Sequence, residues 1–175
     1  RTLTYRVAWL LDHEVDPRQI LLLTFTNKAA REMTGRVREL ATHDTSALWA
    51  GTFHSIGSRI LRRHATDIGF TRSFSILDRD DQKSMLNGVI GSLDIDTKER
   101  RFPRADVLSS IFSLAENTGS PLEEIIADRH DHLYDWIEQI QLVHQGYTAK
   151  KHNSNSMDFD DLLVQTVRLF ETFPD

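Results

Sequence analysis

Apolar residues change their spacing along the first part of the chain, and the changes predict one helix and two strands. Residues 2–12 place apolar side chains at helical intervals, which predicts an amphipathic helix. Residues 20–23 are four consecutive aliphatics, a pattern typical of a strand buried on both faces of a parallel sheet. A second apolar run at 47–50 predicts another strand. This part of the chain therefore has an α/β pattern.

The same two residues follow both predicted strands. Thr24-Phe25 follows the first strand and Thr52-Phe53 follows the second, and each pair leads into a predicted helix, over about 27–40 and 54–64. In an open α/β sheet, ligands bind beyond the carboxyl ends of the strands. We therefore expect the two Thr-Phe pairs to form one composite surface.

A third short strand is predicted at 74–77, with Asp78 as the N-cap of the next element. Beyond it the apolar spacing is helical only. It predicts helices that include residues 85–90, 107–112, 133–143 and 159–170.

Local signals place the boundaries of these later helices. Pro103 is expected in the first turn of one helix, where proline is tolerated. Ser120 is expected to open a capping box with Glu123 for a short helix. Residues 153–156 are polar and predict a connector before the last helix.

Composition limits the class of protein. The chain is 39% hydrophobic and 27% charged, contains no cysteine, and has neither a secretory leader nor an apolar run long enough to cross a bilayer. We expect a cytoplasmic protein without disulfides, thiolate metal sites or a membrane partner. Its charge is uneven: residues 16–63 hold eight Lys and Arg against four Asp and Glu, while residues 64–175 hold eleven against twenty. Local positive charge around the Thr-Phe pairs favours a polyanionic partner, although a solvated mixed-charge surface gives similar counts.

The residues of the two turns suit single-stranded nucleic acid. Phe25 and Phe53 could stack on bases, and helix N-termini beside them favour phosphate. Packing beneath the sheet edge is the alternative for both rings. Donors to the sugar-phosphate backbone are expected from Thr24, Thr26, Asn27, Thr52, His54 and Ser55.

Other polar clusters have simpler explanations. His130 and His132 do not share a helical face, so a metal site there is disfavoured, and no metal ligand or catalytic residue is assigned. The carboxylates of 158–161 stand at a helix start, where they favour the macrodipole. Two sets of basic residues are expected to be plain exposed surface. The first is Arg59, Arg62 and Arg63. The second, which could also touch duplex DNA, is Lys98, Arg100, Arg101 and Arg104.

Several stretches together resemble superfamily 1 helicases of the UvrD/Rep/PcrA group. The most specific is residues 23–33 (LTFTNKAAREM), and the next is 51–55 (GTFHS) with its following arginines. Residues 74–82 (FSILDRDDQ) and 157–163 (MDFDDLL) match in order and spacing. The resemblance covers the whole chain.

The resemblance implies a RecA-like P-loop NTPase fold, an α/β parallel sheet that is only partly present here. Residues 1–80 and 157–175 would belong to it, and 81–156 would form an inserted all-α subdomain. The parent protein would use ATP and magnesium to move three-prime to five-prime along single-stranded DNA, meet the duplex junction and unwind it. DNA contacts are implied for Thr24, Phe25, Thr26, Asn27, Thr52, Phe53 and His54, and an adenine contact for Arg1.

Two family motifs are missing from the sequence. It contains no Gly-x-x-x-x-Gly-Lys-Ser/Thr for ATP phosphates and no Asp-Glu after a hydrophobic strand for magnesium. We therefore expect a helicase fragment that does not bind ATP well or hydrolyse it alone, and that functions with the other helicase domains of its parent. The alternatives are a non-catalytic DNA-binding or protein-interaction module derived from a helicase, and a nuclease-linked relative.

Overall fold

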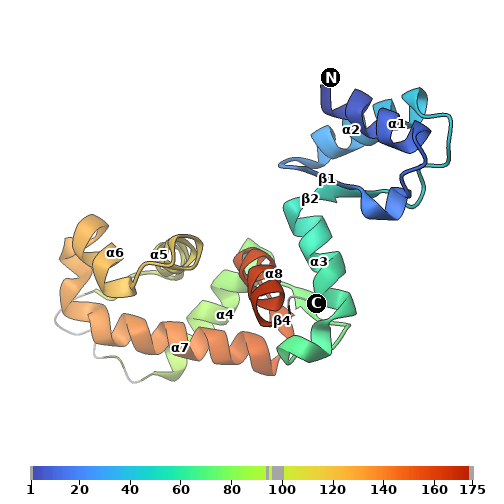
Figure 1. Ribbon diagram of the computed structural model, residues 1–175. Coiled ribbons are helices and arrows are strands. Elements are labelled where there is room, and N and C mark those ends of the chain that lie inside the picture. Colours follow the sequence, from blue (N-terminus) through green and yellow to red (C-terminus); the bar gives the residue numbers. More distant parts are fainter. Residues whose placement is uncertain (1, 94, 96–100, 174–175) are drawn as a thin grey trace. The chain divides into compact units, whose positions relative to one another are not determined.

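The computed structural model describes residues 2–93, 95 and 101–173 (Figure 1). The chain divides into two compact units, Arg1–Ile60 and Leu61–Asp175. In the described part, no helix combines the length and the apolar character that a membrane span requires. Each unit has its own apolar core.

The first unit is a small parallel α/β layer. Its elements are α1 (Thr2–Asp12), a 3-10 turn η1 (Pro17–Gln19), β1 (Leu21–Thr24), α2 (Asn27–Leu40), β2 (Trp49–Thr52) and the start of α3 (Phe53–Arg63). β1 and β2 pair in parallel, and α1 and α2 lie on the same side of the two strands (Figure 1). The predicted opening helix, both strands and both following helices are confirmed; β2 lies two residues later than expected, and α3 one residue earlier.

The core of the first unit covers only one face of β1. Leu22 packs with Val7, Leu11 and Val37 from α1 and α2. Leu21 points the other way and is 54% exposed, because successive strand residues face opposite sides of a sheet. The expectation that this strand is buried on both faces is therefore wrong within the described unit, where α1 and α2 cover a single face.

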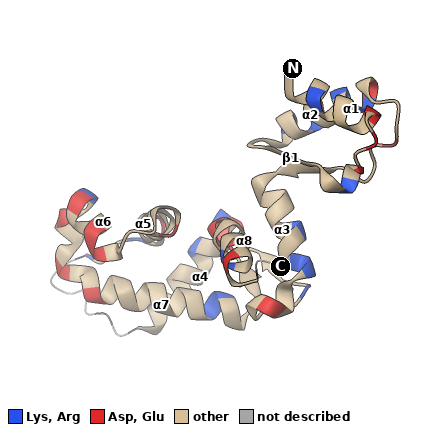
Figure 2. Ribbon diagram, viewed as in Figure 1, with Lys and Arg blue, Asp and Glu red and all other residues tan. Residues whose placement is uncertain are grey.

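The second unit is mainly helical. It contains η2 (Ala65–Ile68), β3 (Ser75–Ile76), α4 (Arg79–Ser92), α5 (Ala105–Thr118), α6 (Leu122–Arg129), η3 (Asp131–Trp136), α7 (Ile137–Asn153), β4 (Ser156–Met157) and α8 (Phe159–Thr172). α4, α5, α6 and α7 share one apolar core, whose fully buried members include Leu86, Leu108, Ile111, Ile126, Ile140 and Val143. Acidic residues cluster on the outside of α6 (Figure 2).

Two strands of two residues each bring distant parts of this unit together. β3 pairs in parallel with β4, so Ser75 stands opposite Ser156 and Ile76 opposite Met157. The sequence predicted β3, but it predicted only a polar connector at 153–156, where the chain in fact ends α7 and enters β4. A strand of two residues is too short to show the alternation that identifies one.

Helix boundaries in this unit confirm one predicted cap and contradict two predictions. Asp78 caps α4, and its capping box with Asp81 is complete. Pro103 is not in the first turn of α5, because Arg104 is the N-cap and the helix begins at Ala105. Ser120 does not cap α6, since Pro121 holds the N-cap position and makes no side-chain cap bond.

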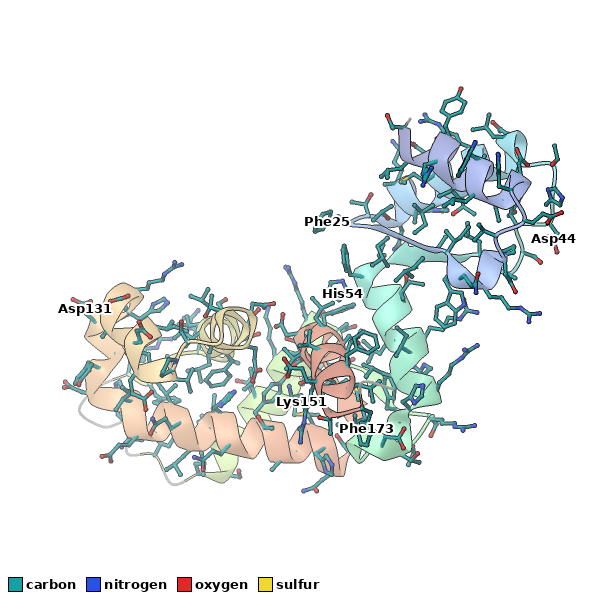
Figure 3. The ribbon with its side chains drawn as sticks, viewed as in Figure 1. Phe25, Asp44, His54, Asp131, Lys151 and Phe173 are labelled. Atoms are coloured by element: carbon teal, nitrogen blue, oxygen red, sulfur yellow. The ribbon has the colours of Figure 1, made fainter. Side chains whose placement is uncertain are left out.

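A buried ion cluster joins α7 to α8 (Figure 3, at the label of Lys151). Lys151 Nζ lies 2.7 Å from a carboxylate oxygen of Asp158 and 2.7 Å from one of Asp161, and its side chain is only 9% exposed. Tyr147 donates its hydroxyl proton to the same Asp158 oxygen at 3.0 Å. Asp158 is also the N-cap of α8. The helix-start explanation of these carboxylates is confirmed, but the sequence did not reveal their shared cation.

Candidate nucleic-acid interface

The register of β1 and β2 brings the two Thr-Phe pairs together. Thr24 is paired with Thr52 at the last rung of the two parallel strands. The next residue of each chain is a phenylalanine, so Phe25 and Phe53 leave the sheet at adjacent points of one edge. The expected composite surface is therefore present in the first unit.

Phe25 and Phe53 face each other at this edge. Their ring centroids are 5.5 Å apart and the ring planes meet at 46°. Phe25 is 90% exposed and Phe53 is 43% exposed, so packing beneath the sheet edge does not explain Phe25. The two exposed rings together present an apolar surface at this edge.

The first turn is held by its two threonines. Thr24 is buried, and its hydroxyl donates to the carbonyl oxygen of Thr26 at 3.1 Å. Thr26 is the N-cap of α2, because its side-chain oxygen accepts the backbone N–H of Ala29 at 3.1 Å. Phe25 lies between these two fixed residues, and Asn27 begins the helix with an exposed side chain. The turn thus holds Phe25 outward at the start of a helix.

The second turn has a different local structure despite its similar sequence. Thr52 is buried and its side-chain oxygen accepts the backbone N–H of Ser55 at 3.2 Å. The helix begins at Phe53, immediately after the strand, whereas α2 begins three residues after Thr24. In the second turn, the threonine that caps the helix is Thr52, the last residue of the strand. In the first turn it is Thr26, two residues after the last strand residue.

His54 follows Phe53 in the first turn of α3 (Figure 3). Its side chain is half-buried, while Thr24 and Thr52 are buried and bonded within their own turns. The exposed residues among the predicted donors are Thr26, Asn27 and Ser55, and the Ser55 hydroxyl donates to the Thr52 carbonyl oxygen within its own turn.

Cations lie along the helix that starts at this edge. Lys28, Arg31, Arg36 and Arg38 are all exposed on α2 (Figure 2). The Nε of Arg31 donates to the carbonyl oxygen of Asn27 at 3.3 Å, which places one cation in the first turn. This arrangement favours a polyanion near the aromatic pair.

The arginines of α3 are less uniform than expected. Arg59 is exposed and its guanidinium stacks over the Trp49 ring at 4.0 Å. Arg62 donates to the carbonyl oxygens of Arg72 and Phe74, and lies 4.2 Å over the Phe74 ring. The prediction of a plain solvated face is wrong for Arg62, because its guanidinium satisfies backbone carbonyls.

The sequence and the described residues offer few candidate contacts for ATP or magnesium. Arg1, the predicted adenine contact, lies outside the described residues, and no Gly-x-x-x-x-Gly-Lys-Ser/Thr occurs in the sequence. In the described ranges no group of three or more His, Asp or Glu residues is placed to hold a metal ion. Of the predicted basic loop, Lys98 and Arg100 also lie outside the described residues, while Arg101 and Arg104 are exposed.

Comparison with known proteins places the chain in a family. A family model described as the UvrD/REP helicase N-terminal domain matches residues 1–175, the whole chain. The chain belongs to this UvrD/REP helicase family. The resemblance expected from residues 23–33 and 51–55 is thereby confirmed.

Similar individual proteins are named as helicases. The chain is 40% identical over 177 aligned residues to the ATP-dependent DNA helicase PcrA of Staphylococcus epidermidis, and equally to that of Staphylococcus aureus. Each alignment covers 100% of this chain and 23% of the relative. The chain thus spans about a quarter of the length of these UvrD/REP family members.

Proposed function

We propose that this chain is part of an ATP-dependent DNA helicase that moves three-prime to five-prime along single-stranded DNA and unwinds the duplex at a junction. Membership of the UvrD/REP family and 40% identity to PcrA helicases support the proposal. ATP and magnesium would be bound by the parent protein through residues outside this sequence, and they would supply the energy for movement. The single-strand track would be shared with the other helicase domains of the parent.

The observation that carries the proposal is the exposed Phe25–Phe53 pair at the carboxyl ends of two adjacent parallel strands. Stacking of a base on an aromatic ring contributes about 1–3 kcal/mol, and it needs no particular base sequence. A motor that moves along DNA of any sequence requires contacts of that kind. The two phenylalanines are proposed to stack on neighbouring bases.

Polar residues of the same turns would hold the sugar-phosphate backbone. Asn27 and Thr26 are exposed at the start of α2, where the positive end of the helix dipole favours phosphate. His54, in the first turn of α3, would donate an N–H to a second phosphate, which requires no positive charge on the ring. Thr24 and Thr52, buried at the strand ends, would act mainly by fixing the two turns.

The domain organisation that we propose follows the family resemblance. Residues 1–80 and 157–175 would belong to a RecA-like domain, and 81–156 would be a helical subdomain inserted in it. The β3–β4 pair supports an insertion, because it brings Ser75–Ile76 beside Ser156–Met157 from either end of the helical block.

Titration of fluorescently labelled single-stranded DNA tests the proposed function. Anisotropy should report binding that weakens as salt is raised, because phosphate contacts release counterions. Phe25→Ala should weaken binding by roughly tenfold, the equivalent of one lost stack. Leu21→Ala is the matched control, since Leu21 is also exposed but lies at the opposite end of β1. Unchanged affinity of the Phe25→Ala variant in the full-length parent would exclude the proposed DNA contact.

A further inference from the structure

The passage from β2 to α3 has no linker, and a reciprocal pair of bonds holds it. The backbone N–H of Thr52 donates to Ser55 Oγ at 2.9 Å, and the backbone N–H of Ser55 donates to Thr52 Oγ1 at 3.2 Å. The Ser55 hydroxyl donates in turn to the Thr52 carbonyl oxygen at 2.9 Å. Thr52 and Ser55 therefore form a capping box in which serine holds the position usually taken by Glu or Gln.

Gly51 makes room for this arrangement. A Cβ atom at position 51 would lie 2.5 Å from Ser55 Oγ, which is closer than non-bonded atoms approach. The next nearest atom is Ile56 Cγ1 at 3.4 Å, an ordinary contact distance. The lack of a side chain at Gly51 is thus required chiefly by one oxygen atom, the hydroxyl of Ser55.

Phe53 stands between the two bonded residues. It is the first residue of α3, so its backbone direction is set where Thr52 stops being strand and the helix begins. The distance of 5.5 Å between its ring and that of Phe25 depends on this direction. A helix that began one residue later would leave Phe53 outside the helix, and its ring would then point in another direction.

We propose that Ser55 and Gly51 are positioning residues for single-stranded DNA binding: the Ser55 hydroxyl fixes the start of α3 so that Phe53 faces Phe25, and Gly51 leaves the space that this hydroxyl occupies. The inference rests on the proposed function of the aromatic pair. This role replaces the DNA contact expected of Ser55, because the Ser55 hydroxyl donates to the Thr52 carbonyl oxygen instead. Ser55 and Gly51 both act through the direction of the Phe53 ring.

The test is a double-mutant cycle at positions 51 and 55 in the full-length helicase that carries this chain. Ser55→Ala should raise the DNA concentration that half-saturates the DNA-stimulated ATPase by about fivefold, the size associated with the loss of one cap. Gly51→Ala should raise it by at least as much, because the new methyl group displaces Ser55 Oγ. In the Ser55→Ala background, Gly51→Ala should have almost no further effect, since the oxygen that it would meet is gone. The DNA-independent ATPase rate should stay unchanged in all three variants.

Gly35→Ala is the matched control for the glycine substitution. Gly35 lies in α2, and a Cβ there would have no heavy atom within 4 Å, so affinity for DNA should not change. Equal effects of Gly51→Ala with and without the Ser55 hydroxyl would overturn the inference. So would normal half-saturation by the Ser55→Ala variant when Phe25→Ala weakens binding, a result that leaves the proposed function intact. Normal binding by Phe25→Ala would overturn the proposed function itself.

Discussion

Thr24 and Thr52 stand opposite each other at the last rung of two parallel strands, and this pairing places Phe25 beside Phe53. The relationship depends on the backbone register rather than on contacts between the phenylalanines. A shift of register by one residue would turn every side chain of one strand to the other face and would separate the rings. Strand pairing and turn capping therefore act together to set the aromatic surface.

Thr26→Ala should destabilise the chain by about 1 kcal/mol, because Thr26 Oγ1 caps the Ala29 N–H at the start of α2. Thr34→Ala, in the same helix, is the control: its hydroxyl bonds only to the Ala30 carbonyl oxygen four residues back, so a smaller change is expected. Urea unfolding followed by circular dichroism measures both. Equal destabilisation by the two substitutions would contradict the capping role.

Lys151→Met should be strongly destabilising, by about 3 kcal/mol or more, because it leaves the buried Asp158 and the partly buried Asp161 without their cation. Lys150→Met changes the neighbouring residue, which is exposed, and should change the free energy of unfolding by less than about 0.5 kcal/mol. The difference between the two midpoints of urea unfolding tests the cluster. Similar midpoints would show that Lys151 does not compensate the two carboxylates.

The same cluster predicts a dependence of stability on pH. Burial, and then the charge of Asp158, raise the pKa of Asp161 to about 6, although Lys151 opposes the rise. Lys151 lowers the pKa of Asp158 below its usual 3.8 in spite of burial, so Asp158 loses its proton first. Between pH 3.8 and about 6, the folded chain therefore holds a proton on Asp161 that the unfolded chain has released.

This contribution of Asp161 to stability is complete below the unfolded pKa of 3.8 and is lost as the pH rises through about 6. The free energy of unfolding should fall across that window by up to about 1.4 kcal/mol per pH unit from this group alone. Subtracting the pH profile of the Asp161→Asn variant from that of the wild type separates the contribution of Asp161 from that of the histidines, which is common to both proteins. A difference profile that is flat, or that rises with pH, would contradict the raised pKa.

Gly146→Ala should destabilise the helical unit by about 1–3 kcal/mol although alanine is the better helix former. A Cβ at Gly146 would lie 2.8 Å from Val89 Cγ1, where α7 crosses α4. Gly91→Ala, in α4, meets no heavy atom within 4 Å and should instead be neutral or slightly stabilising. If α4 and α7 pack as described, thermal melting should show a lowered midpoint for Gly146→Ala and an unchanged or slightly raised midpoint for Gly91→Ala.

Patterns along the sequence predicted the helices and longer strands because each buries an apolar face with regular spacing. The Thr-Phe surface was predictable for a related reason: carboxyl ends of parallel strands meet at one edge. Three features escaped the sequence because no regular spacing of apolar residues marks them. β4 has only two residues, the cation shared by Asp158 and Asp161 comes from the preceding helix, and Arg62 bonds to carbonyls ten and twelve residues away.

Similar local sequences also concealed a difference between the two turns. Both contain Thr-Phe, but Thr26 caps α2 whereas Thr52 itself caps α3. A capping residue is recognised by its position relative to the helix start, and here that start is shifted by two residues. The repeated Thr-Phe sequence predicted where the two rings would lie, but not which threonine hydroxyl would cap the helix next to each ring.

Phe25 and Phe53 are proposed to act as one surface for single-stranded DNA, and a double-mutant cycle on these two residues tests that proposal. Dissociation constants are measured by anisotropy for the wild type, Phe25→Ala, Phe53→Ala and the double variant of the full-length parent, at one salt concentration. Each single substitution should weaken binding. The double variant should lose less binding free energy than the sum of the two single losses, because rings in contact share one stack of bases. Strict additivity would contradict a shared surface, and unchanged affinity in both single variants would contradict the DNA contact itself.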